Sequence, residues 1–154
     1  MNERGMIIDT AHMSRKGMEE ILRLSQKPIL NSHSNARALQ NHSRNLPDEI
    51  IDLFPKNGGV IGLNIYHTFI TDEPEPTMDR YLDHIDYIIR RIGSDHVALG
   101  TDRHGIPIAR TVQGLDNVTG VALLQEKVTD RFGAEVAQKF FHDNALRVLE
   151  SNLK

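Results

Sequence analysis

Short apolar runs alternate with longer segments of helical periodicity along the chain. Short runs bounded by turn residues are typical of buried strands, and apolar residues three and four apart are typical of amphipathic helices. Strands that alternate with helices form parallel sheets, so the pattern predicts an α/β fold with about four parallel strands. The runs that predict these strands are "GMIIDTAH" at 5–12, "ILNSH" at 29–33, "GVIGLN" at 59–64 and "HVALGTD" at 96–102.

The helical segments have recognisable starts and ends. Ser14 and Thr77 are suited to cap two of them, because a side-chain oxygen can accept a hydrogen bond from a free N–H group of the first turn. Pro47 suits the start of another helix over 48–54, which Pro55 should help to end. The apolar positions that recur at helical spacing are Met18, Ile21 and Leu22; Tyr81, Leu82, Ile85, Ile88, Ile89 and Ile92; Val121, Leu124 and Val128; and Val136, Phe140, Leu146 and Leu149.

The composition is that of an ordinary globular domain. With 154 residues, 39% of them hydrophobic, and a formal net charge of -3, the chain is predicted to form a single domain over residues 1–154. The 18 Lys and Arg residues are spread among 21 Asp and Glu residues, so we expect no nucleic-acid partner. No apolar run approaches about 18 residues and no signal-peptide core is evident, so we expect a cytoplasmic protein without a membrane partner.

Four polar residues stand at corresponding places, each at the end of a predicted strand: His12, His33, Asn64 and Asp102. Parallel α/β folds build their active sites at this edge of the sheet. If the first two strands are neighbours, both imidazoles converge on one point and can ligate a divalent metal, while an aspartate at a later strand end can act on a metal-bound water. The alternative is that each His is a hydrogen-bonded structural group. Because the chain has no cysteine, any metal must be held by His and carboxylates.

Two arginines follow the second predicted strand, Arg37 and Arg44. Arginines in such places are usually solvated, but one of them could hold a substrate carboxylate through a two-pronged contact. Five other histidines are expected to be structural or solvated: His42, His67, His84, His96 and His142.

Several motifs, taken in order, resemble the C-terminal half of the renal-type (membrane) dipeptidase family. They are "DTAHMS", "SHSNARAL", "HSRNLPDEII", "GGVIGLN", "DHIDYI" and "GTDRHGIP". The resemblance spans nearly the whole chain, and "SHSNARAL" followed by "RNLPDE" is its most specific part. It implies a metal-dependent dipeptidase with a TIM-like (β/α)₈ barrel and two zinc ions. This chain would form half of that barrel, with additional C-terminal helices.

The resemblance also implies roles for individual residues. His12 and His33 match positions that bind one of the two zinc ions. Arg44 matches the position that binds the carboxylate of the dipeptide, and Asn64 is predicted to join it in substrate binding. Asp102 matches the position that contacts the metal-bridging water and transfers protons.

The sequence departs from the family pattern in two respects. The family's ligands for the other zinc, a His-x-Asp pair and a bridging carboxylate, cannot be assigned in this chain, nor can a further substrate-binding His. Met1 precedes the first predicted strand by a few residues, so the chain is expected to be a fragment, a split gene product or the product of an internal start. In addition, His104 stands where the family usually has a second aspartate, and Arg103 stands where it has an aromatic residue.

A half-barrel leaves two strand edges and one apolar sheet face without a partner. We therefore expect the chain to associate with a separate N-terminal half or with a second copy of itself, as a homo-oligomer. The leading hypothesis is a zinc-dependent dipeptidase that cleaves the peptide bond of dipeptides. The alternatives are a non-catalytic half-barrel remnant and another barrel metallohydrolase with a different substrate.

Overall fold

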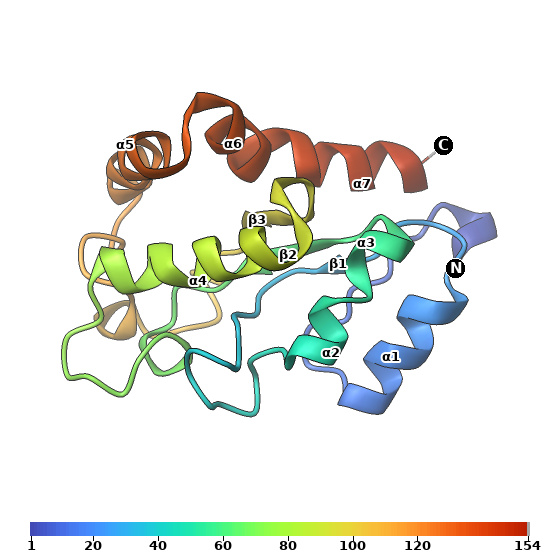
Figure 1. Cartoon of the computed structure of the whole chain (residues 1–154), viewed down its shortest axis with the longest axis horizontal. Helices are drawn as coiled ribbons and strands as arrows, with labels where there is room; N and C mark the ends of the chain where they lie inside the picture. The colour runs from blue at the N-terminus through green and yellow to red at the C-terminus, as the bar shows by residue number, and fades with distance from the viewer. Residues whose placement is uncertain (154) are drawn as a thin grey trace.

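The computed structural model describes residues 1–153, which form a small parallel sheet surrounded by helices (Figure 1). The strands are β1 (Leu30–Asn31), β2 (Val60–Leu63) and β3 (Val97–Leu99). The α-helices are α1 (Arg15–Leu24), α2 (Asp48–Ile51), α3 (Phe54–Asn57), α4 (Met78–Ile92), α5 (Gly120–Phe132), α6 (Ala134–Gln138) and α7 (Asn144–Asn152). A π-helical turn, η5 (Lys139–Asp143), joins α6 to α7, and short 3₁₀ turns are η1 (Asn2–Arg4), η2 (His67–Phe69), η3 (Ser94–His96) and η4 (Ile108–Arg110).

The sheet is parallel, as predicted, with the order β1-β2-β3, but it has three strands in place of about four. Residues 5–12 form no strand and contribute only a parallel bridge between Asp9 and Leu30. Two backbone hydrogen bonds hold it: Thr10 N–H donates to the Leu30 carbonyl (2.8 Å) and Leu30 N–H donates to the Ile8 carbonyl (3.0 Å). The ladder ends there because the Asp9 carboxylate accepts the Ala11 N–H (3.0 Å) and the backbone turns at His12 (φ 67°).

The predicted caps of the two longest amphipathic segments before residue 100 are confirmed. Ser14 Oγ accepts the Gly17 N–H (3.2 Å) at the start of α1, and Thr77 Oγ1 accepts the Arg80 N–H (3.3 Å) at the start of α4. The predicted helix over 48–54 is wrong in its extent, because it breaks into α2 and α3. Pro55 is the reason, since it lacks an N–H and sits in the first turn of α3, where none is needed.

The core lies mainly between the sheet and the helices α1 to α4. Along β2 the side chains of Ile61 and Leu63 point to one face of the sheet and join this core, together with Tyr81 and Ile85 of α4, all fully buried. The opposite face carries a second, smaller cluster of Val60, Ala98 and Val148. The sheet is therefore apolar on both faces, as parallel sheets usually are.

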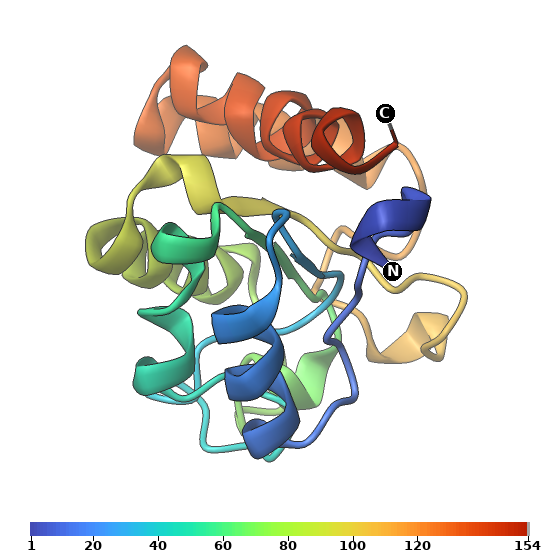
Figure 2. The ribbon, with the colours of Figure 1, turned by 90° about the vertical axis from the view of Figure 1, so that its right-hand side faces the viewer.

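Helix α7 runs across the N-terminal ends of all three strands. Asn152 donates to the Pro28 carbonyl ahead of β1 (2.9 Å), Arg147 donates to the Gly58 carbonyl ahead of β2 (2.6 Å), and Asn144 donates to the Ser94 carbonyl ahead of β3 (2.7 Å). Figure 2 shows α5 to α7 on one side of the molecule and the two termini near each other. The N-terminal edge of the sheet is thereby closed, and the opposite edge is left for polar side chains.

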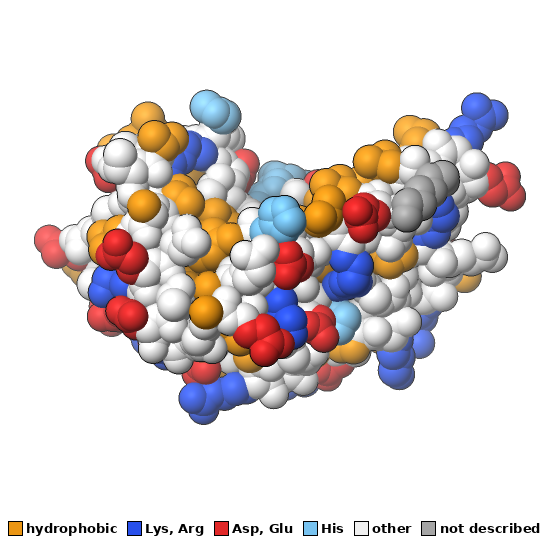
Figure 3. Space-filling model, turned by 90° about the horizontal axis from the view of Figure 1, so that it is seen from above, with side chains coloured by type: hydrophobic (Ala, Val, Ile, Leu, Met, Phe, Trp, Pro, Cys, Tyr) orange, Lys and Arg blue, Asp and Glu red, His pale blue; other side chains and the backbone are white. Residues whose placement is uncertain are grey.

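Apolar side chains are also exposed on the side of the C-terminal helices. Figure 3, which looks onto these helices, shows apolar patches among the charged side chains. The exposed leucines of α5 and α7 are Leu123, Leu146 and Leu149. Among residues 1–153, no helix is long and apolar enough to span a membrane.

Candidate metal and substrate site

The two histidines at the C-terminal edge of the sheet converge. His12 follows the Asp9–Leu30 bridge and His33 follows β1, and their Nε2 atoms lie 2.9 Å apart with ring centroids separated by 4.9 Å. The rings meet edge to face at 62°. The structure therefore places these two predicted ligands next to each other at the C-terminal edge of the sheet, although the segment that carries His12 forms only a bridge and not a strand.

Asp102 and Asn64 complete this edge. The Asp102 carboxylate lies 3.9 Å from His33 Nε2 and accepts a hydrogen bond from Asn64 Nδ2 (3.3 Å). Asn64 Oδ1 in turn accepts the Tyr66 N–H (2.6 Å), which fixes the direction of the amide. All four polar residues predicted from the strand ends thus belong to one cluster.

Two of these residues adopt an unusual backbone conformation. His12 (φ 67°) and Asp102 (φ 52°) are the non-glycine residues with positive φ among those described. Such conformations carry strain in residues with a Cβ and recur at functional sites. Gly105 leaves room for Asp102, because a Cβ at position 105 would collide with the Asp102 carboxylate. The "GTDRHG" turn is therefore shaped around this carboxylate.

Arg44 lies near the same cluster and differs in its contacts from Arg37. Arg37 is occupied by backbone carbonyls, those of His42 (3.2 Å) and Ser43 (2.9 Å). The guanidinium of Arg44 stands over the Phe69 ring, 5.9 Å from its centroid, and its buried Nη2 has no hydrogen-bond partner among the described residues. Arg44 is accordingly the better candidate for binding an external carboxylate.

Burial affects the titration of two groups in this cluster, Arg44 and His33. It lowers the pKa of the Arg44 guanidinium, with Asp102 and Asp9 acting in the opposite direction. Burial also lowers the pKa of His33, and this effect outweighs the negative charge of Asp102, which raises that pKa. His33 therefore favours the neutral imidazole, the form that can ligate a metal.

A buried polar network that the sequence analysis missed holds the loop between β1 and α2. The Phe69 carbonyl accepts hydrogen bonds from Asn45 Nδ2 (2.8 Å) and Asn35 Nδ2 (3.5 Å). Asn35 also donates to the Asn64 carbonyl (3.0 Å). Asn45 adjoins Arg44 and Asn35 lies two residues after His33, so the network ties the candidate substrate and metal residues to one carbonyl. The only sign of this network in the sequence is the asparagine within each of the motifs "SHSNARAL" and "RNLPDE".

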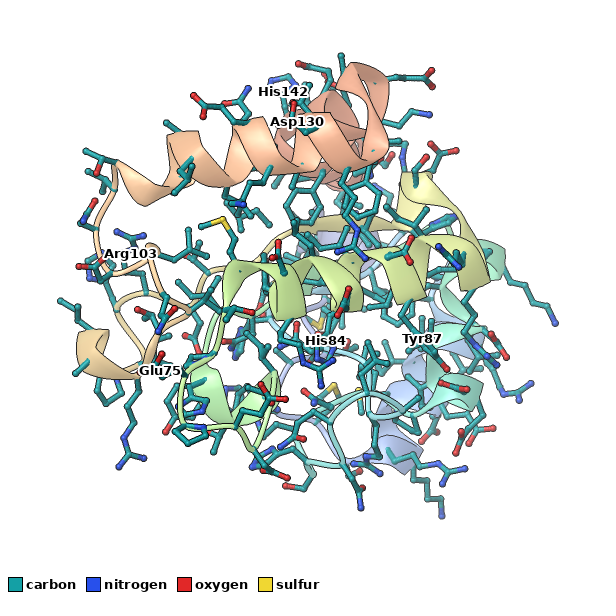
Figure 4. All side chains as sticks on the ribbon, turned by 60° about the vertical axis from the view of Figure 1, so that its left-hand side comes forward. Glu75, His84, Tyr87, Arg103, Asp130 and His142 are labelled. Carbon is teal, nitrogen blue, oxygen red and sulfur yellow. The ribbon has the colours of Figure 1, made fainter. Side chains whose placement is uncertain are left out.

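His84 belongs to the same layer. It points from α4 toward the loops beneath that helix (Figure 4), and its Nδ1 accepts the Ala36 N–H (3.2 Å) while Nε2 pairs with the Ile70 carbonyl (3.1 Å). Because the carbonyl can only accept, the proton resides on Nε2. The expectation that His84 is structural is consistent with this, and the residue it supports lies three positions after His33.

We expect His84 to make the stability of the fold sensitive to acid. Burial lowers its pKa from 6.5 to about 4, so the unfolded state binds a proton more readily than the folded state between these values. The contribution of neutral His84 to the free energy of unfolding is complete above pH 6.5. It is lost as the pH falls toward 4, by about 3 kcal/mol at most. Urea unfolding at several pH values measures this. In His84→Gln the loss over this range should be smaller; an unchanged pH dependence would contradict the prediction.

The other histidines make local contacts. His42 accepts the Arg44 N–H (3.1 Å), His67 pairs with the Glu73 carbonyl (2.6 Å), His96 with the Gly59 carbonyl (2.8 Å), and His142 with Asp143 (2.7 Å). His142 projects from the far side of the C-terminal helices (Figure 4). His104 is exposed.

Arg103, one of the departures from the family pattern, is turned toward the following loop, where it donates to the carbonyls of Leu115 (3.1 Å) and Asn117 (2.8 Å). It thus supports the loop after β3.

The residues present fit part of a zinc site. Two nitrogens bound tetrahedrally to one zinc ion lie about 3.3 Å apart, given Zn–N bonds of about 2.0–2.1 Å. The 2.9 Å between the Nε2 atoms of His12 and His33 needs only a small opening to reach this. Within residues 1–153, however, no group of three or more His, Cys, Asp or Glu side chains is arranged to hold a metal. His12 and His33 are therefore two candidate ligands, fewer than the three or four that zinc usually has.

Comparisons with known proteins place the chain in a family. A sequence profile of the membrane dipeptidase family, peptidase family M19, matches residues 1–153. Dipeptidase tcpJ of Claviceps purpurea is 37% identical over 155 residues, an alignment that covers 97% of this chain and 35% of that protein. Dipeptidase verJ of Clonostachys rogersoniana is 35% identical over 155 residues, covering 98% of this chain and 38% of that protein.

Solved structures share the fold. Dipeptidase AC, a metallopeptidase of family M19, has a TM-score of 0.90 at 30% identity, covering 99% of this chain and 46% of that one. A metallopeptidase from Rhodobacter sphaeroides, liganded with a phosphinate mimic of the dipeptide L-Ala-D-Ala, has a TM-score of 0.89 at 31% identity, covering 98% of this chain and 44% of that one. The chain thus spans somewhat over a third of these curated relatives and less than half of these solved chains.

Proposed function

Because the chain belongs to the membrane dipeptidase family, peptidase family M19, we propose that it acts as the C-terminal half of a zinc-dependent dipeptidase. The single observation that carries the proposal is the convergence of His12, His33 and Asp102 at one strand edge. The related Rhodobacter sphaeroides structure, liganded with a dipeptide mimic, supports the choice of substrate class.

In this proposal the residues of the chain divide the work. His12 and His33 hold one zinc ion, which when bound supplies Lewis-acid activation of water and of the peptide carbonyl. Asp102 receives a proton from the attacking water and passes it to the leaving amine, while Asn64 keeps its carboxylate in place. Arg44 binds the carboxylate of the dipeptide with its unpartnered Nη2 and orients the scissile bond.

The proposal includes a partner. The outer edge of β3 is where a TIM-like barrel would continue, because such a barrel closes by pairing one strand with the next. We propose that an N-terminal half, or a second copy of the chain, pairs there and supplies the remaining metal ligands. A non-catalytic half-barrel would associate in the same way without binding metal or cleaving dipeptides.

We expect the isolated chain to bind zinc weakly, because two protein ligands fall short of the usual three or four. His12→Ala or His33→Ala should abolish this binding, since either change leaves a single nitrogen. Titration against a colorimetric zinc chelator measures the affinity. His142→Ala, on the far side of the molecule, is the matched control and should bind as the parent does. Tight, stoichiometric zinc binding by the monomeric parent chain would contradict the proposal that the chain supplies only two of the zinc ligands.

Arg44→Lys tests the substrate class. In the protein completed by its N-terminal half, this variant should lose about 10-fold or more of kcat/KM for dipeptides, because a point charge cannot reproduce a planar two-pronged contact. A dipeptide blocked as its C-terminal amide should be a poor substrate of the parent and should lose little further in the variant. Arg37→Lys is the control. Equal kinetics of the parent and Arg44→Lys would rule out the carboxylate contact.

A further inference from the structure

Asp9 makes contacts with both segments that carry the converging histidines. Its Oδ1 accepts the Ala11 N–H (3.0 Å), next to His12, and the Ser32 N–H (3.0 Å), next to His33. Its Oδ2 accepts the Ser32 hydroxyl (2.6 Å). The same hydroxyl oxygen lies 2.7 Å from His33 Nδ1. A chain of hydrogen bonds therefore runs from the Asp9 carboxylate through Ser32 to the His33 ring.

The direction of this chain follows from counting protons. An ionised carboxylate only accepts hydrogen bonds, and a serine has one O–H to donate. The Ser32 proton is committed to Asp9, so the Ser32 oxygen can only accept at its other contact. His33 must therefore carry its proton on Nδ1 and donate it to Ser32. Its Nε2 is left with a lone pair that faces His12 Nε2 at 2.9 Å.

We propose that Asp9 and Ser32 are positioning residues that hold His33 in the tautomer protonated on Nδ1 and so present Nε2 as a metal ligand. Asp9 has a second role through Oδ1, because its contact with the Ala11 N–H sets the turn that brings His12 opposite His33. Partners of this kind behind a metal-binding imidazole fix its tautomer and orientation. Only the use made of the lone pair rests on the proposed zinc site; the tautomer itself does not.

Asp9→Asn inverts the chain of hydrogen bonds and tests it directly. The two backbone N–H groups keep an oxygen at the Oδ1 place, so the amide nitrogen must face Ser32 and donate to it. The Ser32 hydroxyl is then free to donate to His33 Nδ1, and the ring must move its proton to Nε2. Ser32→Ala removes the link and should leave a mixture of the two tautomers.

Nitrogen-15 NMR of the imidazole rings at pH 8 distinguishes the tautomers in the metal-free chain. We expect the Nδ1–H form of His33 in the parent, the Nε2–H form in Asp9→Asn and a mixture in Ser32→Ala. Ser34→Ala, one residue after His33, is the control and should resemble the parent. Backbone amide spectra confirm that each variant is folded. An Nε2–H form in the parent, or an unchanged Nδ1–H form in a folded Asp9→Asn variant, would overturn the proposal.

Zinc affinity gives a second readout. In the protein completed by its N-terminal half, Asp9→Asn and Ser32→Ala should each weaken zinc binding by about 10–100-fold, and Ser34→Ala should not. If the tautomers change as expected while zinc affinity stays constant, the positioning role is overturned. If the completed parent binds no zinc, the proposed function fails, whereas the tautomer results on the metal-free chain still decide whether the hydrogen-bond chain exists.

Discussion

Dipeptide hydrolysis should be negligible with the 154-residue chain alone and should rise to kcat values of about 1–10³ s⁻¹ when an N-terminal half is supplied. A two-metal reaction needs both ions held close together, a bridging ligand, an activated water and a group that protonates the leaving amine. The described residues offer two imidazoles and one carboxylate at the strand edge and no group of three metal-binding side chains. Under the proposed function, an N-terminal half or a second copy of the chain would supply the remaining ligands.

The measurement is a zinc-supplemented assay of the chain alone, of a fusion to the N-terminal half of a relative such as dipeptidase tcpJ, and of the two halves mixed. A fusion carrying His33→Ala is the matched control and should stay inactive. If the chain alone is monomeric and cleaves dipeptides at an ordinary enzymatic rate, the half-site is wrong. His67 and the exposed His104 would then be the first residues to reconsider as ligands.

Asp102→Asn should lower kcat of the completed enzyme by about 10²–10⁴-fold with little change in zinc content. The amide keeps the size and shape of the carboxylate but cannot accept a proton from the attacking water. The hydrogen bond that Asn64 donates to Asp102 Oδ2 (3.3 Å) can be kept by the amide oxygen, so the local structure should persist. Steady-state kinetics and metal analysis of the same preparation separate the two effects.

Asp130→Asn is a suitable control for this prediction, because Asp130 is exposed on α5, away from the strand edge (Figure 4). It should retain full activity. If Asp102→Asn loses its zinc together with its activity, Asp102 is a ligand or a support for one, and the proton-transfer role is wrong. Activity close to that of the parent would remove Asp102 from the mechanism altogether.

The parts of the fold that local pattern determines were predictable from the sequence. The apolar runs located β2 and β3, and Ser14 and Thr77 marked the starts of α1 and α4 because capping depends on residues only three positions apart. The first run was misassigned as a strand. Its apolar pattern is that of a strand, but the Asp9 side chain ends the pairing after one bridge. That competition between side chain and backbone is not visible in periodicity.

The candidate site was predictable to a similar degree. The strand-end rule located His12, His33, Asn64 and Asp102, because strand ends in a parallel sheet share one edge. It could not find Asn35, Asn45 or His84, which act through contacts between residues far apart in the chain, such as Ala36 with His84 across 48 positions. Nor could it find Asp9 and Ser32, although both stand inside the quoted motifs. The role of Asp9 and Ser32 depends on which nitrogen of His33 carries the proton, and the spacing of residues along the chain does not indicate this.

The helix that crosses beneath the strands has a consequence for how the protein is made. Asn152 bonds to the carbonyl of Pro28 across 124 positions, and Arg147 bonds to that of Gly58 across 89. Contacts of such long range slow folding, because a large loop must close before they form. During synthesis, the hydrogen bonds from α7 to the residues ahead of β1 and β2 cannot form until α7 has left the ribosome.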